Sequence, residues 1–149
     1  MGYLVAPSSL TAAFKQAMQH AHRYLSVVDQ AVLADFIHQG HFARHIRRMR
    51  ALYLNAKSVL IDAIRRELAP TLTVDPAPAG LHLVGWLKSG LDDREVTAAA
   101  AQQGIEVAPI SGYSLRPEAK QGLVLGYAML NEAEIVNGVQ GLRRALAQI

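Results

Sequence analysis

The stretch "GLVLGYAMLNEAEIVNGVQGL", residues 122–142, decides how this chain folds. Its first part, residues 122–129, is a short apolar run and predicts a strand. Asn131 is an N-cap residue type and predicts the start of a final helix. The apolar residues of this helix recur on one face: Ile135, Val139, Leu142 and Leu146. The stretch therefore predicts a strand followed directly by an amphipathic helix.

The residues before it predict two more strands and four more helices. "GLHLVGWL" (80–87) alternates like a strand, "IEVAPIS" (105–111) is a second strand, and "DDREVTAAAAQQG" (92–104) predicts a helix with an acidic first turn and a glycine stop. Three helices are expected at 10–25, 28–39 and 42–68, the first capped by Ser8 or Ser9 and the last stopped by Pro70. Residues 69–80 are rich in Pro and Ala and are interpreted as a loop.

The apolar segment "GYLVAP" (2–7) predicts one further strand, and it lies three helices away from the others. A strand without a neighbour leaves its backbone donors and acceptors unpaired, which is costly. We expect it either to join the small sheet at an edge or to find partners outside these residues. The whole pattern predicts an α+β fold with a short, mainly antiparallel sheet packed with helices.

The composition fits one globular domain of 149 residues, with 51% apolar and 18% charged residues. There is no cysteine, which excludes disulfides, a thiolate nucleophile and Cys-ligated metals. No apolar run approaches the roughly 20 residues of a membrane-spanning helix. We therefore expect a cytoplasmic protein with no membrane partner.

The stretch "GHFARHIRRMR" (40–50) concentrates basic residues within a net charge of +3 and raises the question of nucleic-acid binding. Helical spacing places Arg44, Arg47 and Arg48 away from the apolar Phe42 and Ile46, as on a solvated face. Neither a helix-turn-helix pattern nor interleaved aromatic residues accompany them. We expect at most a weak, salt-sensitive attraction to DNA.

Other chemistry finds little support in the sequence. His41 and His45 share a helical face, but Phe42 stands where a metalloprotease would need glutamate, and no third ligand is near. No phosphate-binding glycine loop, nucleophile elbow or paired carboxylates are present. We expect no metal site and no catalytic residue.

Five segments together are similar to the C-terminal part of the MocR-type regulators, which belong to the GntR superfamily. These proteins join a winged helix-turn-helix domain to a fold-type-I aminotransferase-like domain. The similarity covers essentially the whole chain, and each segment stands in the expected order. The segments are "GYLVAP", "ADFIHQGHFARHIRRMRALY", "AGLHLVGWL", "GIEVAPISGYS" and "GLVLGYAMLNEAEIVNGVQGL".

This resemblance implies that residues 1–7 are the last strand of a large subdomain and that residues 8–149 are the small C-terminal subdomain. In the family, the lysine that binds pyridoxal phosphate and an arginine for its phosphate would fall before Met1, as would the DNA-binding domain. The resemblance thus implies a pyridoxal phosphate cofactor for the full-length family and none for this chain alone. The implied partners are the large subdomain or a homologous chain, a homodimer in the family, and an amino-acid-like effector; DNA is reached only through the N-terminal domain.

The resemblance also places candidate site residues on the cofactor and effector side. Ser111 and Tyr113 follow a strand in "APISGYSLRP", where a loop exposes hydroxyls and amides. Arg116 in the same loop could hold a carboxylate. Alternation places His82 on the opposite face of its strand from Leu81 and Leu83, and the resemblance implies a structural or indirect role for it. Many aminotransferases have a carboxylate-binding arginine where this chain has Val124.

The sequence therefore favours an effector-sensing fragment of a MocR-type regulator that neither catalyses nor binds DNA by itself. Val124 favours the regulator over the first alternative, a fragment of a class I or II aminotransferase. The second alternative is a stand-alone interaction module that docks through residues 1–7 by strand addition.

Overall fold

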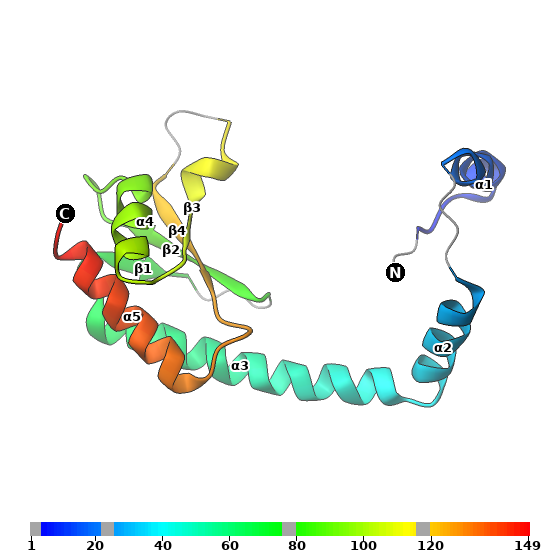
Figure 1. Cartoon of the computed structure of the whole chain (residues 1–149), viewed down its shortest axis with the longest axis horizontal. Coiled ribbons are helices and arrows are strands. Elements are labelled where there is room, and N and C mark those ends of the chain that lie inside the picture. The colour runs from blue at the N-terminus through cyan, green and yellow to red at the C-terminus, as the bar shows by residue number, and fades with distance from the viewer. Residues whose placement is uncertain (1–3, 22–25, 76–79, 116–119) are drawn as a thin grey trace. The chain divides into compact units, whose positions relative to one another are not determined.

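A computed structural model describes residues 4–21, 26–75, 80–115 and 120–149 of the chain. The chain divides into two compact units, Met1–Arg48 and Met49–Ile149, and the long helix α3 (His41–Glu67) carries the division between them. Figure 1 labels the helices and strands of both units.

The first unit is helical. It contains a short 3-10 helix, η1 (Ser8–Leu10), then α1 (Thr11–His20), α2 (Val27–His38) and the beginning of α3. The Ser26 hydroxyl accepts a hydrogen bond from the Asp29 amide and caps α2. Gly40, with φ of 76°, separates α2 from α3. None of the described residues of this unit is buried, so its helices are held by local hydrogen bonds rather than by a core.

Two expectations for this unit are not met. Residues 4–7 form no strand, and Leu4 and Val5 are 67% and 87% exposed. A strand requires a hydrogen-bonding neighbour, and residues 4–7 do not join the described sheet at its edge; the other alternative, that their partners lie outside this chain, stays a prediction. The predicted serine cap is also wrong: Ser8 and Ser9 lie inside η1, and no side chain caps α1. Gly2, Tyr3 and the end of the predicted first helix, 22–25, lie outside the described residues.

The second unit contains the sheet. Its elements after α3 are β1 (Leu72–Val74), β2 (His82–Leu87), α4 (Asp93–Gln102), β3 (Ala108–Pro109), η2 (Ile110–Tyr113), β4 (Gly122–Gly126) and α5 (Glu132–Leu146). The described strands are ordered β1-β2-β4-β3, and every neighbouring pair is antiparallel. The predicted α+β fold with an antiparallel sheet is confirmed.

Two details of the predicted sheet are wrong. Residues 72–74, interpreted as loop, form the edge strand β1, which pairs with β2 from Leu72↔Leu87 to Val74↔Gly85. Three residues between prolines are too few to show a period. The strand predicted at 105–111 shrinks to β3, because the chain turns into η2 at Ile110.

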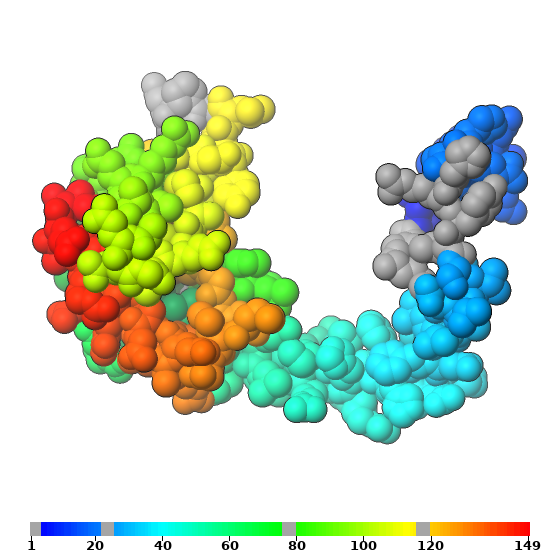
Figure 2. Space-filling view, in the orientation of Figure 1, coloured from blue at the N-terminus to red at the C-terminus, as the bar shows by residue number. Residues whose placement is uncertain are grey.

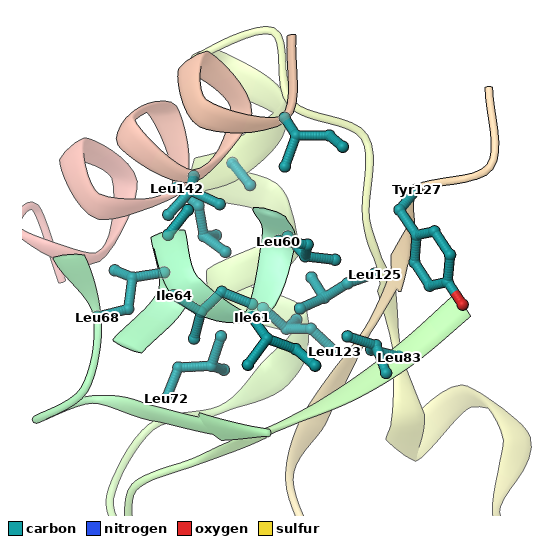
Figure 3. Close-up of a cluster of buried hydrophobic side chains, with 14 of the residues drawn as sticks. Leu60, Ile61, Ile64, Leu68, Leu72, Leu83, Leu123, Leu125, Tyr127 and Leu142 are labelled. Carbon is teal, nitrogen blue, oxygen red and sulfur yellow. The ribbon is translucent and has the colours of Figure 1, made fainter. Parts of the chain in front are cut away.

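The core lies between one face of the sheet and three helices (Figure 3). The sheet contributes side chains that alternate inward, among them Leu83, Leu87, Leu123 and Leu125. The helices α3, α4 and α5 contribute to the same cluster through, for example, Ile64, Val96 and Val139. Since all three helices pack on this face, the second unit has two layers, and none of its described helices covers the other face of the sheet.

The connection from β4 to α5 follows the prediction. Asn131 accepts a hydrogen bond from the Glu134 amide, and the Glu134 carboxylate accepts one from the Asn131 amide, which together form a capping box. Ile135, Val139 and Leu142 are buried, and Leu146 packs against the core. Among the described residues, no helix has the length and apolar character to cross a membrane.

Candidate functional site

The helix-free face of the sheet carries the side chains that alternate outward from β2 and β4. His82 is exposed, and Val84 and Trp86 are half-buried, whereas the intervening residues of β2 are buried. Val124 on β4 lies directly opposite Val84, and β3 continues the sheet beside it. The predicted orientation of His82, away from Leu83, is therefore confirmed. We call His82, Val84, Trp86 and Val124 the open face.

Two glycines of β4 leave room for the larger side chains of this face. Gly126 pairs with His82, and a Cβ at Gly126 would lie 3.5 Å from Cδ2 of the imidazole. Gly122 pairs with Trp86, and a Cβ at Gly122 would lie 3.0 Å from Cε3 of the indole. The rings of His82 and Trp86 therefore lie close to the β4 backbone.

Trp86 is fixed at one end of the open face. Its indole nitrogen donates a hydrogen bond of 3.2 Å to Oδ2 of Asp75. The Nζ of Lys120 lies 4.4 Å from the centre of the ring, in a cation–π contact. The indole thus contacts both Asp75, which follows β1, and Lys120, which lies just before β4.

The loop that follows β3 is held by a buried carboxylate. Asp93 at the start of α4 is 0% exposed. Its Oδ1 accepts from the Ser111 hydroxyl at 2.6 Å, and its Oδ2 accepts from the amides of Ser111 at 2.9 Å and of Gly122 at 3.2 Å. The Asp93 amide in turn donates to Oε1 of Gln121. One carboxylate therefore joins α4, η2 and β4.

The ionisation of Asp93 follows from these contacts. Burial by itself would raise the pKa of the carboxyl group, because the charged form loses water. The hydrogen bonds from Ser111 and Gly122, and the charge of Arg94, act in the opposite direction and leave the pKa below its ordinary value. Asp93 is therefore a carboxylate at neutral pH, and its negative charge is part of the folded structure.

The candidate loop residues differ in their freedom to meet a ligand. The Ser111 hydroxyl is engaged, since it donates to Asp93 and accepts from Nε of Arg94 at 3.3 Å. Tyr113 is 76% exposed, on the surface segment coloured yellow in Figure 2. Arg116 lies outside the described residues. Within this loop, Tyr113 is the better placed of the two described candidates.

The structure does not bring His82 and Ser111 together. His82 is opposite Gly126 at one end of β4, and Ser111 is joined through Asp93 to Gly122 at the other end. These glycines are four residue steps apart along the strand, a distance of roughly 13 Å. Sequence reasoning missed Asp93, which it interpreted only as part of an acidic first turn. The available signal was the pair Asp92–Asp93: one aspartate caps the helix, and the second is left to bind elsewhere.

The described residues do not form a complete cofactor site. The cofactor expected for the family needs a lysine amine and a cage of donors for its phosphate, but the amine of Lys120 lies over Trp86 and the Ser111 hydroxyl is held by Asp93. Lys15, Lys57 and Lys88 lie on α1, α3 and the turn after β2. Within the described ranges there is also no group of three His, Asp or Glu residues that could hold a metal ion.

Sequence comparison relates the chain to bacterial regulators, although no protein-family model matches it. The chain is 38% identical over 145 residues to the probable rhizopine catabolism regulatory protein MocR of Rhizobium meliloti, an alignment that covers 97% of this chain and 29% of that protein. It is 32% identical over 149 residues to an uncharacterised HTH-type transcriptional regulator of Bacillus subtilis, covering 100% of this chain and 32% of that protein.

Structure comparison gives the fold. The α-aminoadipate aminotransferase LysN of Thermus thermophilus, solved in complex with N-(5'-phosphopyridoxyl)-L-leucine, superposes with a TM-score of 0.84 and 23% identity over 97% of this chain and 37% of that chain. The chain is thus an aminotransferase-like α+β domain by fold. By sequence it is similar, over nearly its whole length, to MocR and to other HTH-type transcriptional regulators, which is the similarity its motifs predict. It spans about 30% of the length of these relatives.

Proposed function

We propose that this chain is the C-terminal, effector-sensing part of a pyridoxal-phosphate-dependent MocR-type regulator. Its open face and its η2 loop form one side of a cofactor and effector cavity, and the rest of the regulator forms the other side. By itself the chain neither catalyses a reaction nor binds DNA. It is cytoplasmic, forms part of a homodimer and binds an amino-acid-like effector.

One observation carries this proposal: among the described residues, the helices of the first unit expose apolar side chains, and the second unit has no helix of its own over the half-buried valines of its open face. The helix α2 exposes apolar side chains on several sides, including Val28 and Ile37, and α1 exposes Phe14 and Met18 along one side. A helix that is apolar all round is normally buried. The open face adds Val84 and Val124. Because the relatives are about three times as long, we infer that the remaining part of such a regulator covers both surfaces.

Three side chains of the open face and one of the η2 loop contact the ligands in this proposal. Val84 and Val124 offer an apolar floor, His82 offers ring nitrogens at one end, and Tyr113 offers a phenol on the loop at the other. Asp93 keeps the loop in place without touching the effector. The proposed contacts of Ser111 are indirect, because its hydroxyl already binds Asp93.

A chimera tests the proposal: this chain replaces the aligned region of the Rhizobium meliloti regulator. We expect the purified chimera to retain pyridoxal phosphate after dialysis, seen by its visible absorption, and the 149-residue chain alone to retain none. The chimera with Val124→Glu is the matched variant, and it should still bind the cofactor but respond less to amino acids. A chain that retains one equivalent of cofactor alone, or a chimera that is folded by circular dichroism yet stays empty, would contradict the proposal.

The two alternatives make different predictions. An aminotransferase fragment is supported by the fold, but likeness at 23% identity shows the fold alone. That alternative requires the same chimera to transaminate. A stand-alone interaction module requires that deletion of residues 1–7 abolishes association with a full-length homologue while the second unit stays folded.

A further inference from the structure

An open cleft lies in the second unit, where α3 passes the beginning of β2 and the end of β4. Its volume is about 640 Å³, which is within the range of small-molecule sites. The described residues that line it are Arg50, Tyr53, Leu54, Lys57, Gly80, Leu81 and Tyr127. None of the open-face residues or the η2 loop residues borders it, so it is separate from the surface assigned to the effector.

The α3 side of the cleft presents one helical face. Arg50, Tyr53, Leu54 and Lys57 are spaced i, i+3, i+4 and i+7, which places them in one row along the helix. Two cationic side chains therefore lie on either side of a tyrosine and a leucine. The spacing alone does not predict a cleft, because the opposite wall is formed by Gly80, Leu81 and Tyr127, which are distant in sequence.

The charge of the lining is of one sign. Arg50 and Lys57 are positive, and no carboxylate is among the described lining residues. Within the described chain, the exposed guanidinium of Arg50 forms no ion pair, and the Tyr53 hydroxyl forms no hydrogen bond. A concave surface that carries the unpaired guanidinium of Arg50 attracts anions. Arginine can hold a carboxylate or phosphate through two parallel hydrogen bonds.

The opposite wall is rigid and largely apolar. Tyr127 is buried (Figure 3), and its hydroxyl donates a 2.7 Å hydrogen bond to the Gly80 carbonyl. Burial raises the pKa of Tyr127, so the phenol stays neutral and adds no negative charge to the cleft. Leu54 and Leu81 expose apolar surface on the two sides of the opening. The cleft thus combines a cationic edge with apolar surface suited to the body of a small molecule.

We propose that this cleft binds a small organic oxyanion. Arg50 holds its carboxylate or phosphate group, with Lys57 adding positive charge and Tyr53 a hydroxyl donor, and its apolar or ring portion lies against Leu54 and Leu81. The cleft is a second ligand site, apart from the proposed effector surface, and does not depend on that surface being completed by another part of a regulator.

The test is a titration of the full 149-residue chain followed by the amide signals of its nitrogen-15 spectrum. The probes are benzoate and phenyl phosphate, with benzamide as the uncharged counterpart of benzoate. We expect saturable shifts around residues 50–57, 80–81 and 127 with either anion and no saturation with benzamide. Arg50→Gln should weaken binding about tenfold, because a charge-assisted hydrogen bond is lost.

The matched control is Arg65→Gln, which removes the same charge from an exposed position on the same helix outside the cleft. It should leave the affinity within about twofold, since charge at the surface is screened by salt. Saturation by only one of the two anions would still support the site and would identify the preferred oxyanion. Equal losses in the two variants, shifts spread over the basic surface, or saturation by benzamide would overturn the proposal.

Discussion

The two units of the chain differ in how they use their apolar residues. In Met49–Ile149, side chains from three helices and the sheet meet in one buried cluster. In Met1–Arg48, no described residue is buried, although α2 carries Val28, Val32, Phe36 and Ile37 within twelve positions. The sequences of the two units are similarly apolar, so hydrophobicity alone does not determine which of them folds around its own core.

The two units differ in whether their own internal contacts can stabilise them. Burial of apolar surface is the main favourable contribution to folding, and isolated helices of ten to twelve residues are marginal in water. The second unit therefore accounts for the stability of the chain, and the first unit has helical sequence without the surface that would fix it. This is the pattern expected of a segment whose cover belongs to another part of a longer protein.

Matched large-to-small substitutions in the two units should have the largest difference in effect. Ile64→Ala removes a buried side chain from the core and should lower the free energy of unfolding by about 2–5 kcal/mol. Phe14→Ala in α1 should change it by less than about 0.5 kcal/mol. Urea unfolding monitored by fluorescence of Trp86, the single tryptophan, measures the second unit directly. Equal effects of the two substitutions would contradict the conclusion that the second unit has a buried core and the first does not.

The next largest effect is expected at Asp93. Asp93→Asn replaces an acceptor oxygen by an amide that faces backbone donors, and it should cost about 1–3 kcal/mol. Glu95→Gln is the control, because it removes an equal charge from an exposed position in the same helical turn. If the two substitutions have the same effect in urea unfolding, Asp93 does not join η2 and β4 in the way described.

The pH dependence of the free energy of unfolding gives a second test of the role of Asp93. The pKa of Asp93 is lower in the folded chain than in the unfolded chain, so the unfolded state binds more protons as the solution becomes acidic. The stabilisation is present above the ordinary aspartate pKa of about 3.9 and is lost as the pH falls below it. Unfolding curves between about pH 5 and pH 3 should show a steeper loss for the wild type than for Asp93→Asn. Parallel curves would contradict the lowered pKa.

The smallest effects should appear at two glycines of α5 and should have opposite signs. A Cβ at Gly141 would lie 2.7 Å from Cγ1 and Cδ1 of Ile105, so Gly141→Ala should destabilise the second unit by about 1–2 kcal/mol. A Cβ at Gly138 would meet no atom within 4 Å, so Gly138→Ala should stabilise it by about 0.5–1 kcal/mol through helix propensity. Thermal unfolding of both variants provides the measurement, and two shifts of the same sign would show that α5 packs differently.

Much of the second unit could be predicted from the sequence because its local signals agree with its tertiary contacts. Asn131 and the apolar stripe of α5 predict both the start of the helix and its buried face. The strand β1 and the turn into η2 could not be predicted, because two or three residues of strand carry no period and depend on neighbours distant in sequence. The strand expected in the first unit is absent for a different reason: residues 4–7 have a strand-like composition, but no described strand pairs with them.

The candidate site was predictable only in part. Alternation along β2 gave the direction of His82, because a period of two survives within six residues. The role of Asp93 could not be predicted, since Ser111 follows it by 18 positions and nothing in the sequence indicates their contact. The sequence predicts an exposed hydroxyl at Ser111, whereas in the structure this hydroxyl donates a hydrogen bond to Asp93. The part of Arg116 remains a prediction.

Hydrogen exchange of the amides in α1 and α2 tests the central claim most directly, measured in this chain and in the chimera with the Rhizobium meliloti regulator. We predict that these amides exchange almost as fast as in an unstructured peptide in the chain alone, while those of β4 and α5 are protected, and that α1 and α2 become protected in the chimera. Protection of α1 and α2 equal to that of β4 in the chain alone would contradict the account, because the first unit would then need no cover from outside.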